Sequence, residues 1–233
     1  MPIVMGIDGT GSAIIPGAGR DRDYDRDFAN SFVKRICSTG GGTRGYLRGP
    51  VGLGGGLRSA VNGGYNFIKQ KRNEGDSSDV LLTGYSRGAA GVIMIAKKLQ
   101  GDNIPVKAMM LFDCVDRYLF GDASVIPQNV EIVKHVIRDP LAKSRHSFGN
   151  DGMRYHPPTV YPTIIKFMCT HGGMGGTPWV KPRDKMWTDL IDEGALEQPY
   201  NATTAISYQK DQDVSERIWS HCQIFMRDYG FVS

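Results

Sequence analysis

Apolar residues in this chain gather in short continuous runs instead of alternating with polar ones. The clearest runs are residues 3–7, 80–83, 106–112, 130–137 and 163–169. Each is bounded by glycine, proline or charged residues. A strand that is covered on both faces of a sheet is nearly all apolar, so these runs predict buried strands of a mostly parallel sheet. Residues 44–47 predict a further short strand.

The segments between these runs show helical spacing. Apolar positions recur every three or four residues within 21–37, 57–71 and 212–227, and a similar pattern follows the turn at residue 88 as far as Leu99. Trp179, Trp187 and Trp219 predict that helices of the last third pack on the sheet. Strands that alternate with helices predict an α/β fold, a three-layer sandwich with a mostly parallel central sheet and helices on both faces.

Length and composition support one folded unit. The chain has 233 residues, of which 40% are hydrophobic and 22% charged, so we expect a single α/β domain over residues 1–233. The net charge of +4 permits transient contact with an anionic membrane surface. No basic run with interleaved aromatic residues is present, which argues against nucleic acid as a partner.

Neither a metal site nor an export signal is predicted. The four cysteines are widely spaced and form no CxxC pair, which argues against a zinc site or a disulfide framework, and no cofactor motif is present. The N-terminus lacks a basic lead with a long apolar run, and no apolar run approaches the ~20 residues of a membrane span. We therefore expect a cytoplasmic protein in the producing cell, with any export by a route that needs no signal peptide.

The turn between the predicted strand at 80–83 and the helix that follows carries the pattern Gly-x-Ser-x-Gly, at Gly84, Ser86 and Gly88. In this context the pattern is typical of the nucleophile elbow of serine hydrolases. Side chains at the two glycines would collide where the chain folds back on itself. Ser86 is therefore the candidate nucleophile. The alternative is an ordinary turn whose serine caps the helix.

A base and an acid are placed after later strands. His171 follows the run 163–169 on a glycine-rich loop, which is where a triad base could reach the serine. Asp113 follows the run 106–112, and Asp139 follows the run 130–137, so both are candidates for the acid. Asp113 could instead form a turn or cap a helix. His135 lies inside a predicted strand, and we expect it to be packed or paired there.

The glycine loop after the first strand should lie at the carboxyl edge of the sheet, where α/β proteins place their sites. Backbone N–H groups of Gly9 or Thr10, together with that of Arg87, are candidates for an oxyanion hole. The alternative is a tight turn capped by Asp8. The segment Asp8-Gly9-Thr10 also resembles the phosphate loop of sugar kinases, although the chain is short for that two-lobed fold.

Four segments carry a family resemblance in their order along the chain. They are Asp8-Gly9-Thr10, the elbow with Arg87-Gly88-Ala89, Phe112-Asp113-Cys114-Val115, and the histidine loop 171–176. Together they resemble the α/β-hydrolase domain of the Tle-type phospholipase effectors of type VI secretion and a related hydrolase family, over about residues 3–180. The elbow has a tyrosine where that family has phenylalanine.

The resemblance implies an α/β-hydrolase fold, a lipid ester as substrate and the position of Asp113, in place of Asp139, for the acid. It also implies a secretion-system or immunity partner if the protein is an effector. Our main hypothesis is a serine esterase of lipase or phospholipase type, with Ser86, His171 and Asp113 as its triad. The alternatives are a non-catalytic interaction module on a hydrolase fold, and a phosphotransferase that uses the loop at Asp8-Gly9-Thr10.

Overall fold

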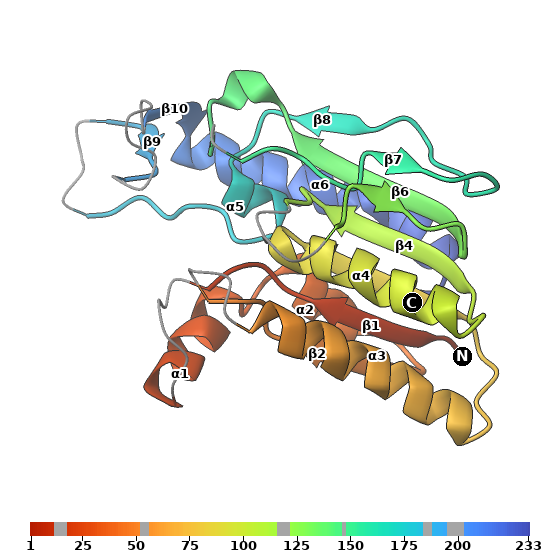
Figure 1. Cartoon of the computed structure of the whole chain (residues 1–233). Coiled ribbons are helices and arrows are strands. Elements are labelled where there is room, and N and C mark those ends of the chain that lie inside the picture. Colours follow the sequence, from red (N-terminus) through yellow and green to blue (C-terminus); the bar gives the residue numbers. More distant parts are fainter. Residues whose placement is uncertain (12–17, 52–55, 116–121, 146–147, 184–187, 195–202) are drawn as a thin grey trace.

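A parallel sheet runs through the centre of the computed structural model, which describes residues 1–11, 18–51, 56–115, 122–145, 148–183, 188–194 and 203–233. Within these residues the sheet has six strands in the order β2-β1-β3-β4-β6-β8, all of them parallel (Figure 1). The strands are β1 (Ile3–Ile7), β2 (Thr43–Leu47), β3 (Val80–Tyr85), β4 (Val106–Phe112), β6 (Val130–Arg138) and β8 (Ile165–Phe167).

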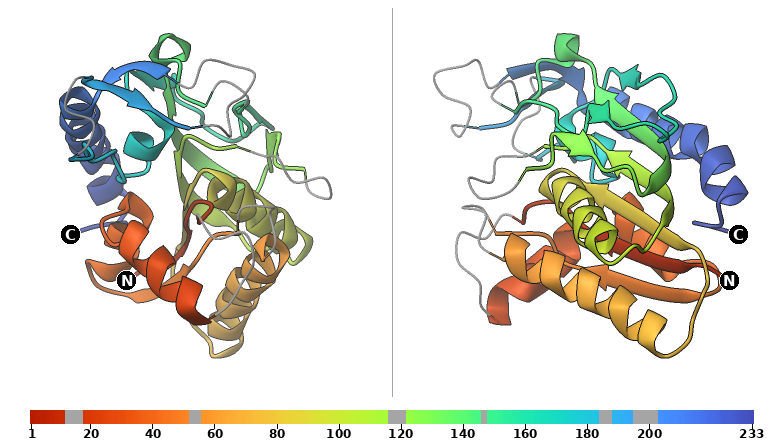
Figure 2. Two further views of the ribbon diagram at one scale, coloured as in Figure 1. Left: turned by 90° about the vertical axis from the view of Figure 1, so that its left-hand side faces the viewer. Right: turned by 45° about the vertical axis from the view of Figure 1, so that its right-hand side comes forward.

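Helices cover both faces of this sheet and make the outer layers (Figures 1 and 2). On one face lie α3 (Leu57–Asn73) and α4 (Arg87–Gly101), and on the other lie α2 (Phe32–Ser38) and α6 (Tyr208–Asp228). The predicted three-layer α/β sandwich is confirmed. The remaining elements are α1 (Ala18–Asp27), β5 (Val125–Ile126), the 3-10 helix η1 (Pro140–Ala142), β7 (Arg154–Tyr155), α5 (His171–Met174), β9 (Leu190–Asp192) and β10 (Thr203–Ser207).

Side-chain alternation along the strands divides the interior into two cores. In β4, Met109 and Leu111 pack in the core under α3 and α4, whereas Met110 and Phe112 pack in the core under α2 and α6. Every residue of β1 and β3 is buried. This explains the unbroken apolar runs of the sequence, because strands covered on both faces have no solvent-facing positions.

The order of the strands places the ends of β1 and β3 side by side. The chain leaves β1 for β2 on one side through α2, and it leaves β3 for β4 on the other side through α4. Because the two connections run in opposite directions, these helices lie on opposite faces of the sheet. The strand arrows of the sheet in Figure 1 point to the left, so the carboxyl ends of its strands lie on the left-hand side of this view.

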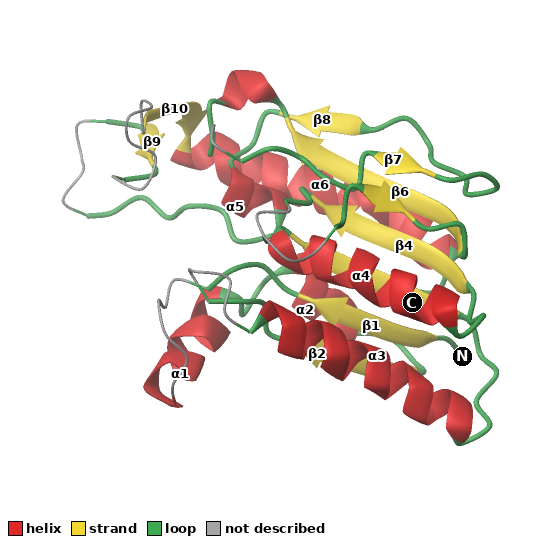
Figure 3. Cartoon of the chain, in the orientation of Figure 1, coloured by secondary structure: helices red, strands yellow, loops and turns green. Residues whose placement is uncertain are grey.

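Some predicted boundaries were wrong. The segment 21–37 is not one helix: α1 ends at Asp27, and Ser31 caps a second helix by accepting a hydrogen bond from the backbone N–H of Lys34. The last third is not purely helical, because β9 and β10 form a small antiparallel sheet there (Figure 3). Trp219 lies in α6 and packs in the core as predicted, whereas Trp179 lies in a loop and Trp187 lies outside the described residues.

The predicted strand 163–169 is shorter than its apolar run. Only residues 165–167 pair, with β6 alone. After β8 the chain turns, and the backbone N–H of Cys169 donates to the carbonyl of Phe167 at 2.9 Å in place of a ladder bond.

The close approach of α4 to β1 gives a first prediction. A Cβ atom at Gly88 would lie 2.2 Å from the carbonyl oxygen of Asp8 and 2.3 Å from that of Ile7. Gly88→Ala should therefore lower the free energy of unfolding by about 1–3 kcal/mol, because backbone must move. Gly101→Ala, on the same helix, is the matched control, since nothing lies within 4 Å of its Cβ position. Urea denaturation measures both, and equal stability of the two variants would contradict the close approach.

Candidate active site

Ser86 occupies the sharp turn between β3 and α4. Its backbone has φ 56° and ψ −129°, a conformation that L residues rarely adopt and that costs about 1–3 kcal/mol. A Cβ atom at Gly84 would lie 2.6 Å from the Cα of Ala89, so the tight turn needs glycine there. The side chain of Ser86 makes no capping hydrogen bond to α4. The alternative of a helix-capping serine is therefore wrong.

His171 faces the hydroxyl of Ser86. It is the first residue of α5, which follows β8, and its Nε2 atom lies 2.8 Å from the Ser86 Oγ. On the other side of the ring, Nδ1 lies 2.6 Å from Oδ2 of Asp113. An ionised carboxylate only accepts hydrogen bonds, so Nδ1–H donates to Asp113 and Nε2 is left to accept from the serine O–H.

Asp113 stands at the end of β4, next to the strand that carries Ser86. It has no exposed surface, and its backbone has a positive φ of 45°. Besides His171, its carboxylate accepts hydrogen bonds from the backbone N–H and the guanidinium of Arg138, at 3.2 and 2.6 Å, and from the amide of Asn150, at 2.8 Å. A buried carboxylate needs such donors to remain charged.

The pKa shifts in this cluster follow from these contacts. Burial alone would raise the pKa of Asp113, but the hydrogen bond and charge of His171 and the charge of Arg138 outweigh it and hold that pKa well below its usual range. The pKa of His171 is lowered, chiefly by burial, and Arg138 and Arg145 lower it further against the opposing effect of Asp113. The buried pair therefore consists of a carboxylate and a neutral imidazole near neutral pH.

Of the two candidate acids, the structure places Asp113 on His171 and Asp139 elsewhere. Asp139 caps η1, where its side chain accepts a hydrogen bond from the backbone N–H of Leu141 at 2.8 Å. Its predecessor Arg138 points inwards instead. The prediction of Asp139 as the alternative acid is therefore wrong, because the strand ends at Arg138 and the next residue turns towards solvent.

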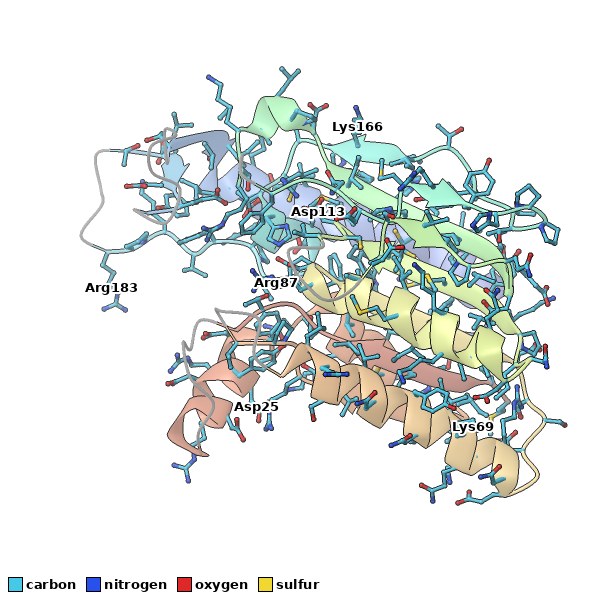
Figure 4. The ribbon with its side chains drawn as sticks, in the orientation of Figure 1. Asp25, Lys69, Arg87, Asp113, Lys166 and Arg183 are labelled. Carbon is cyan, nitrogen blue, oxygen red and sulfur yellow. The ribbon has the colours of Figure 1, made fainter. Side chains whose placement is uncertain are left out.

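The loop after β1 lies against the serine. A Cβ atom at Gly9 would lie 3.3 Å from the Cβ of Ser86, which puts the backbone of this loop beside the hydroxyl. The N–H of Gly9 donates to Oδ1 of Asp8 at 3.0 Å, so Gly9 is used within its own turn. Among the described residues, no partner is found for the N–H of Thr10. Arg87 begins α4 next to Ser86 (Figure 4).

Asp8 is a buried side chain at the start of this loop. Besides Gly9, it accepts hydrogen bonds from the hydroxyls of Ser31 and Tyr46, the latter at 3.1 Å. Burial raises its pKa to about 7 against these donors. The hydroxyl of Tyr24 donates to the carbonyl of Gly9 at 2.7 Å and so holds the same loop from the side of α1.

The histidine loop is held by groups that come from three directions. Asp211 of α6 accepts hydrogen bonds from the backbone N–H and the hydroxyl of Thr170, at 2.8 and 2.9 Å. The Ser144 hydroxyl accepts from the N–H of His171 at 2.8 Å. The hydroxyl of Tyr85, one residue before Ser86, donates to the carbonyl of His171 at 2.8 Å. The backbone of His171 is therefore fixed on both its N–H and its carbonyl.

Sequence reasoning missed these supporting residues, namely Arg138, Asn150, Ser144 and Asp211. Each is polar and lies outside any motif, and each meets its partner across 25 to 41 positions of sequence. The nearest signal was the arginine that ends an apolar strand. The expectation for His135 is confirmed: its Nε2 accepts from the N–H of Cys114 at 3.2 Å, and burial lowers its pKa to about 4.

Two features are absent from the described residues. No group of three or more His, Cys, Asp or Glu side chains in them is placed to hold a metal ion. Across the same residues, no helix combines the length and apolar character needed to cross a membrane.

Comparison with known proteins gives general likenesses only. No protein-family model matches the chain, and no curated protein matches it. An arylesterase structure is 15% identical, with a TM-score of 0.40, over 76% of this chain and 69% of that one. The FE-lacking apo form of ESTFA is 13% identical, with a TM-score of 0.39, over 74% of this chain and 68% of that one.

An uncharacterised protein from Pseudomonas aeruginosa is 16% identical with a TM-score of 0.37; the match covers 76% of this chain and 42% of that protein. This chain thus spans less than half of that protein's length. At these TM-scores the likenesses identify no shared activity, and the geometry of the site carries the functional proposal.

The lowered pKa of His171 can be measured directly. We expect its imidazole to titrate below the ordinary value of about 6.5, because burial disfavours the charged ring. Proton NMR of the ring C–H signals over about pH 4 to 8 gives the midpoint, and the spectrum of His171→Gln identifies which signal is lost. A midpoint above 6.5 would mean that Asp113 dominates over burial and the two arginines.

Proposed function

We propose that the protein is a serine hydrolase that cleaves carboxylic esters. The observation that carries this proposal is the unbroken line of two hydrogen bonds from the Ser86 hydroxyl through His171 to Asp113. Supporting it, the serine sits on a strained turn at the carboxyl edge of the sheet, where α/β proteins place their sites.

The proposed mechanism has two half-reactions. Ser86 Oγ attacks the ester carbonyl while His171 Nε2 takes the hydroxyl proton, and the resulting imidazolium gives that proton to the departing alcohol. Water then repeats the sequence on the acyl-enzyme and releases the acid. Asp113 keeps Nδ1 protonated and stabilises the imidazolium. Its four donors suit this role, because they hold the carboxylate ionised throughout.

The negative charge that develops on the carbonyl oxygen needs donors close to Ser86. We assign the backbone N–H of Arg87, at the N-terminus of α4, and that of Thr10. We exclude the N–H of Gly9 from the oxyanion hole, because it already donates to Asp8. One such donor contributes about 3 kcal/mol to transition-state stabilisation.

For the substrate class we propose lipid esters. The support is the resemblance to phospholipase effectors and the net positive charge, which favours transient contact with anionic headgroups. A secretion-system or immunity partner, and export without a signal peptide, belong to the same proposal. No observation supports the non-catalytic interaction module or the phosphotransferase. Asp8 is fully buried and accepts three hydrogen bonds, so it is poorly placed to act in a phosphotransferase.

Ser86→Ala tests the nucleophile. Hydrolysis of a short p-nitrophenyl ester should fall by about 10⁶-fold in kcat, because no other group supplies the attacking oxygen. A fluorophosphonate probe should label the wild type at Ser86 and leave the variant unlabelled, as read by mass spectrometry. A wild type that is folded but neither labelled nor active would favour the non-catalytic interaction module.

A paired substitution tests the acid. Asp113→Asn should lower kcat by about 10⁴-fold, because an amide no longer fixes the histidine tautomer. Asp139→Asn is the matched control and should keep most of the activity, since this residue only caps η1. Steady-state kinetics on the same ester compares them, and a larger loss in the Asp139 variant would reverse the assignment.

A further inference from the structure

Arg138 brings a buried positive charge to the triad that the proposed mechanism does not use. It is the last residue of β6 and is 6% exposed. Its Nη1 atom lies 2.6 Å from Oδ2 of Asp113, the same oxygen that accepts from His171 Nδ1 at 2.6 Å. A cation and an imidazole N–H therefore share one carboxylate oxygen.

The rest of the guanidinium is fully engaged on one loop. Nε donates to the carbonyl of Ser144 at 3.0 Å, and Nη2 donates to the carbonyls of Arg145, at 3.3 Å, and Phe148. These residues in turn meet the histidine, because Ser144 accepts from the N–H of His171 and the rings of Phe148 and His171 are nearly perpendicular with their centroids 5.3 Å apart. Burying a cation is unfavourable unless it is paired and hydrogen-bonded, and here every donor group is paired.

We propose that Arg138 is a positioning residue of this site, which aligns the carboxylate of Asp113 and draws part of its charge away from His171, so that the base is weaker than in a triad with an unpaired acid. The proposal rests on the proposed function, because it assigns the base its strength. Arg138 itself touches neither the serine nor the reacting bond.

The sign of the effect follows from charge alone. The guanidinium repels an imidazolium at His171 and also neutralises the carboxylate that would stabilise it, so both contributions favour the neutral ring. The lowered pKa of His171 agrees, since Arg138 is among its causes after burial. The other titratable and charged groups of the described residues around the ring and its loop are Asp8, Tyr85, Asp113, Arg145, Glu193 and Asp211.

Three variants separate charge from structure. Arg138→Gln removes the charge. In the pH profile of kcat/KM, the midpoint of the acidic limb should then rise by about one pH unit, as expected for the loss of a charge close to the base. Arg138→Lys keeps the charge, loses the fork of donors, and should lower kcat with the limb near its wild-type position. Asn150→Ala removes a neutral donor from the same carboxylate, so it should lower kcat without moving the limb.

A second readout does not depend on turnover. In a Ser86→Ala background, NMR titration of His171 should give a higher pKa with Arg138→Gln than with Arg138 intact. A folded Gln variant with an unchanged or lower pKa would overturn the proposal. If the Gln variant does not fold, the Lys variant decides, because a limb that moves upwards despite the retained charge would overturn it as well.

The two proposals fail differently. Loss of the proposed function would appear as a wild type without fluorophosphonate labelling, and the titration of His171 would still report the effect of Arg138. Conversely, the wild type could be active and labelled while the pKa of His171 is the same with and without Arg138→Gln. That result would support the proposed hydrolase and overturn the positioning role of Arg138.

Discussion

A single carboxylate oxygen of Asp113 receives both the imidazole of His171 and the guanidinium of Arg138. Both groups are buried, so neither can exchange its partner for water, and removing Arg138 would leave the carboxylate of Asp113 without its cation in the interior. The end of β4, the end of β6 and the histidine loop must therefore assemble together. Their relative placement decides whether Ser86 has a base beside it.

Buried carboxylates hold the other loops at this edge of the sheet in the same way. Asp8 accepts from the backbone of Gly9 and Asp211 from that of Thr170 and Trp179, while Glu193 accepts from that of Arg145. Loops beyond the last ladder bond have backbone N–H groups without sheet partners, and a buried N–H must find an acceptor. Acidic side chains supply these acceptors, and the loops gain fixed positions.

The loop after β1 is held against the elbow by close contact of backbones. Gly88 lets α4 approach the end of β1, and Gly9 lets the loop after β1 approach the elbow. The ring of Tyr85 fills the space between Gly9 and Gly175, with a Cβ atom at either glycine only 2.6 Å from the ring. Through the side chain of Tyr85, β3 thus touches both the loop after β1 and the histidine loop.

Local patterns in the sequence determined much of this protein. Unbroken apolar runs predicted the strands because both faces of the sheet are covered, and the glycines of the elbow predicted the turn because no side chain fits there. The serine, aspartate and histidine that follow separate apolar runs were candidates from the sequence, and the family resemblance favoured Asp113 over Asp139.

Only the tertiary structure distinguished between candidate residues of the same type, such as the two aspartates that follow β4 and β6. On geometry, Asp113 contacts His171 and Asp139 does not, because β6 ends one residue before Asp139 turns outwards to cap η1. The hydroxyl of Ser31, which caps α2, and the N–H of Gly9 both donate to the carboxylate of Asp8. Arg138 contacts Asp113, which lies 25 positions away in the sequence. Such contacts join the ends of different strands, so no period or spacing along the chain records them.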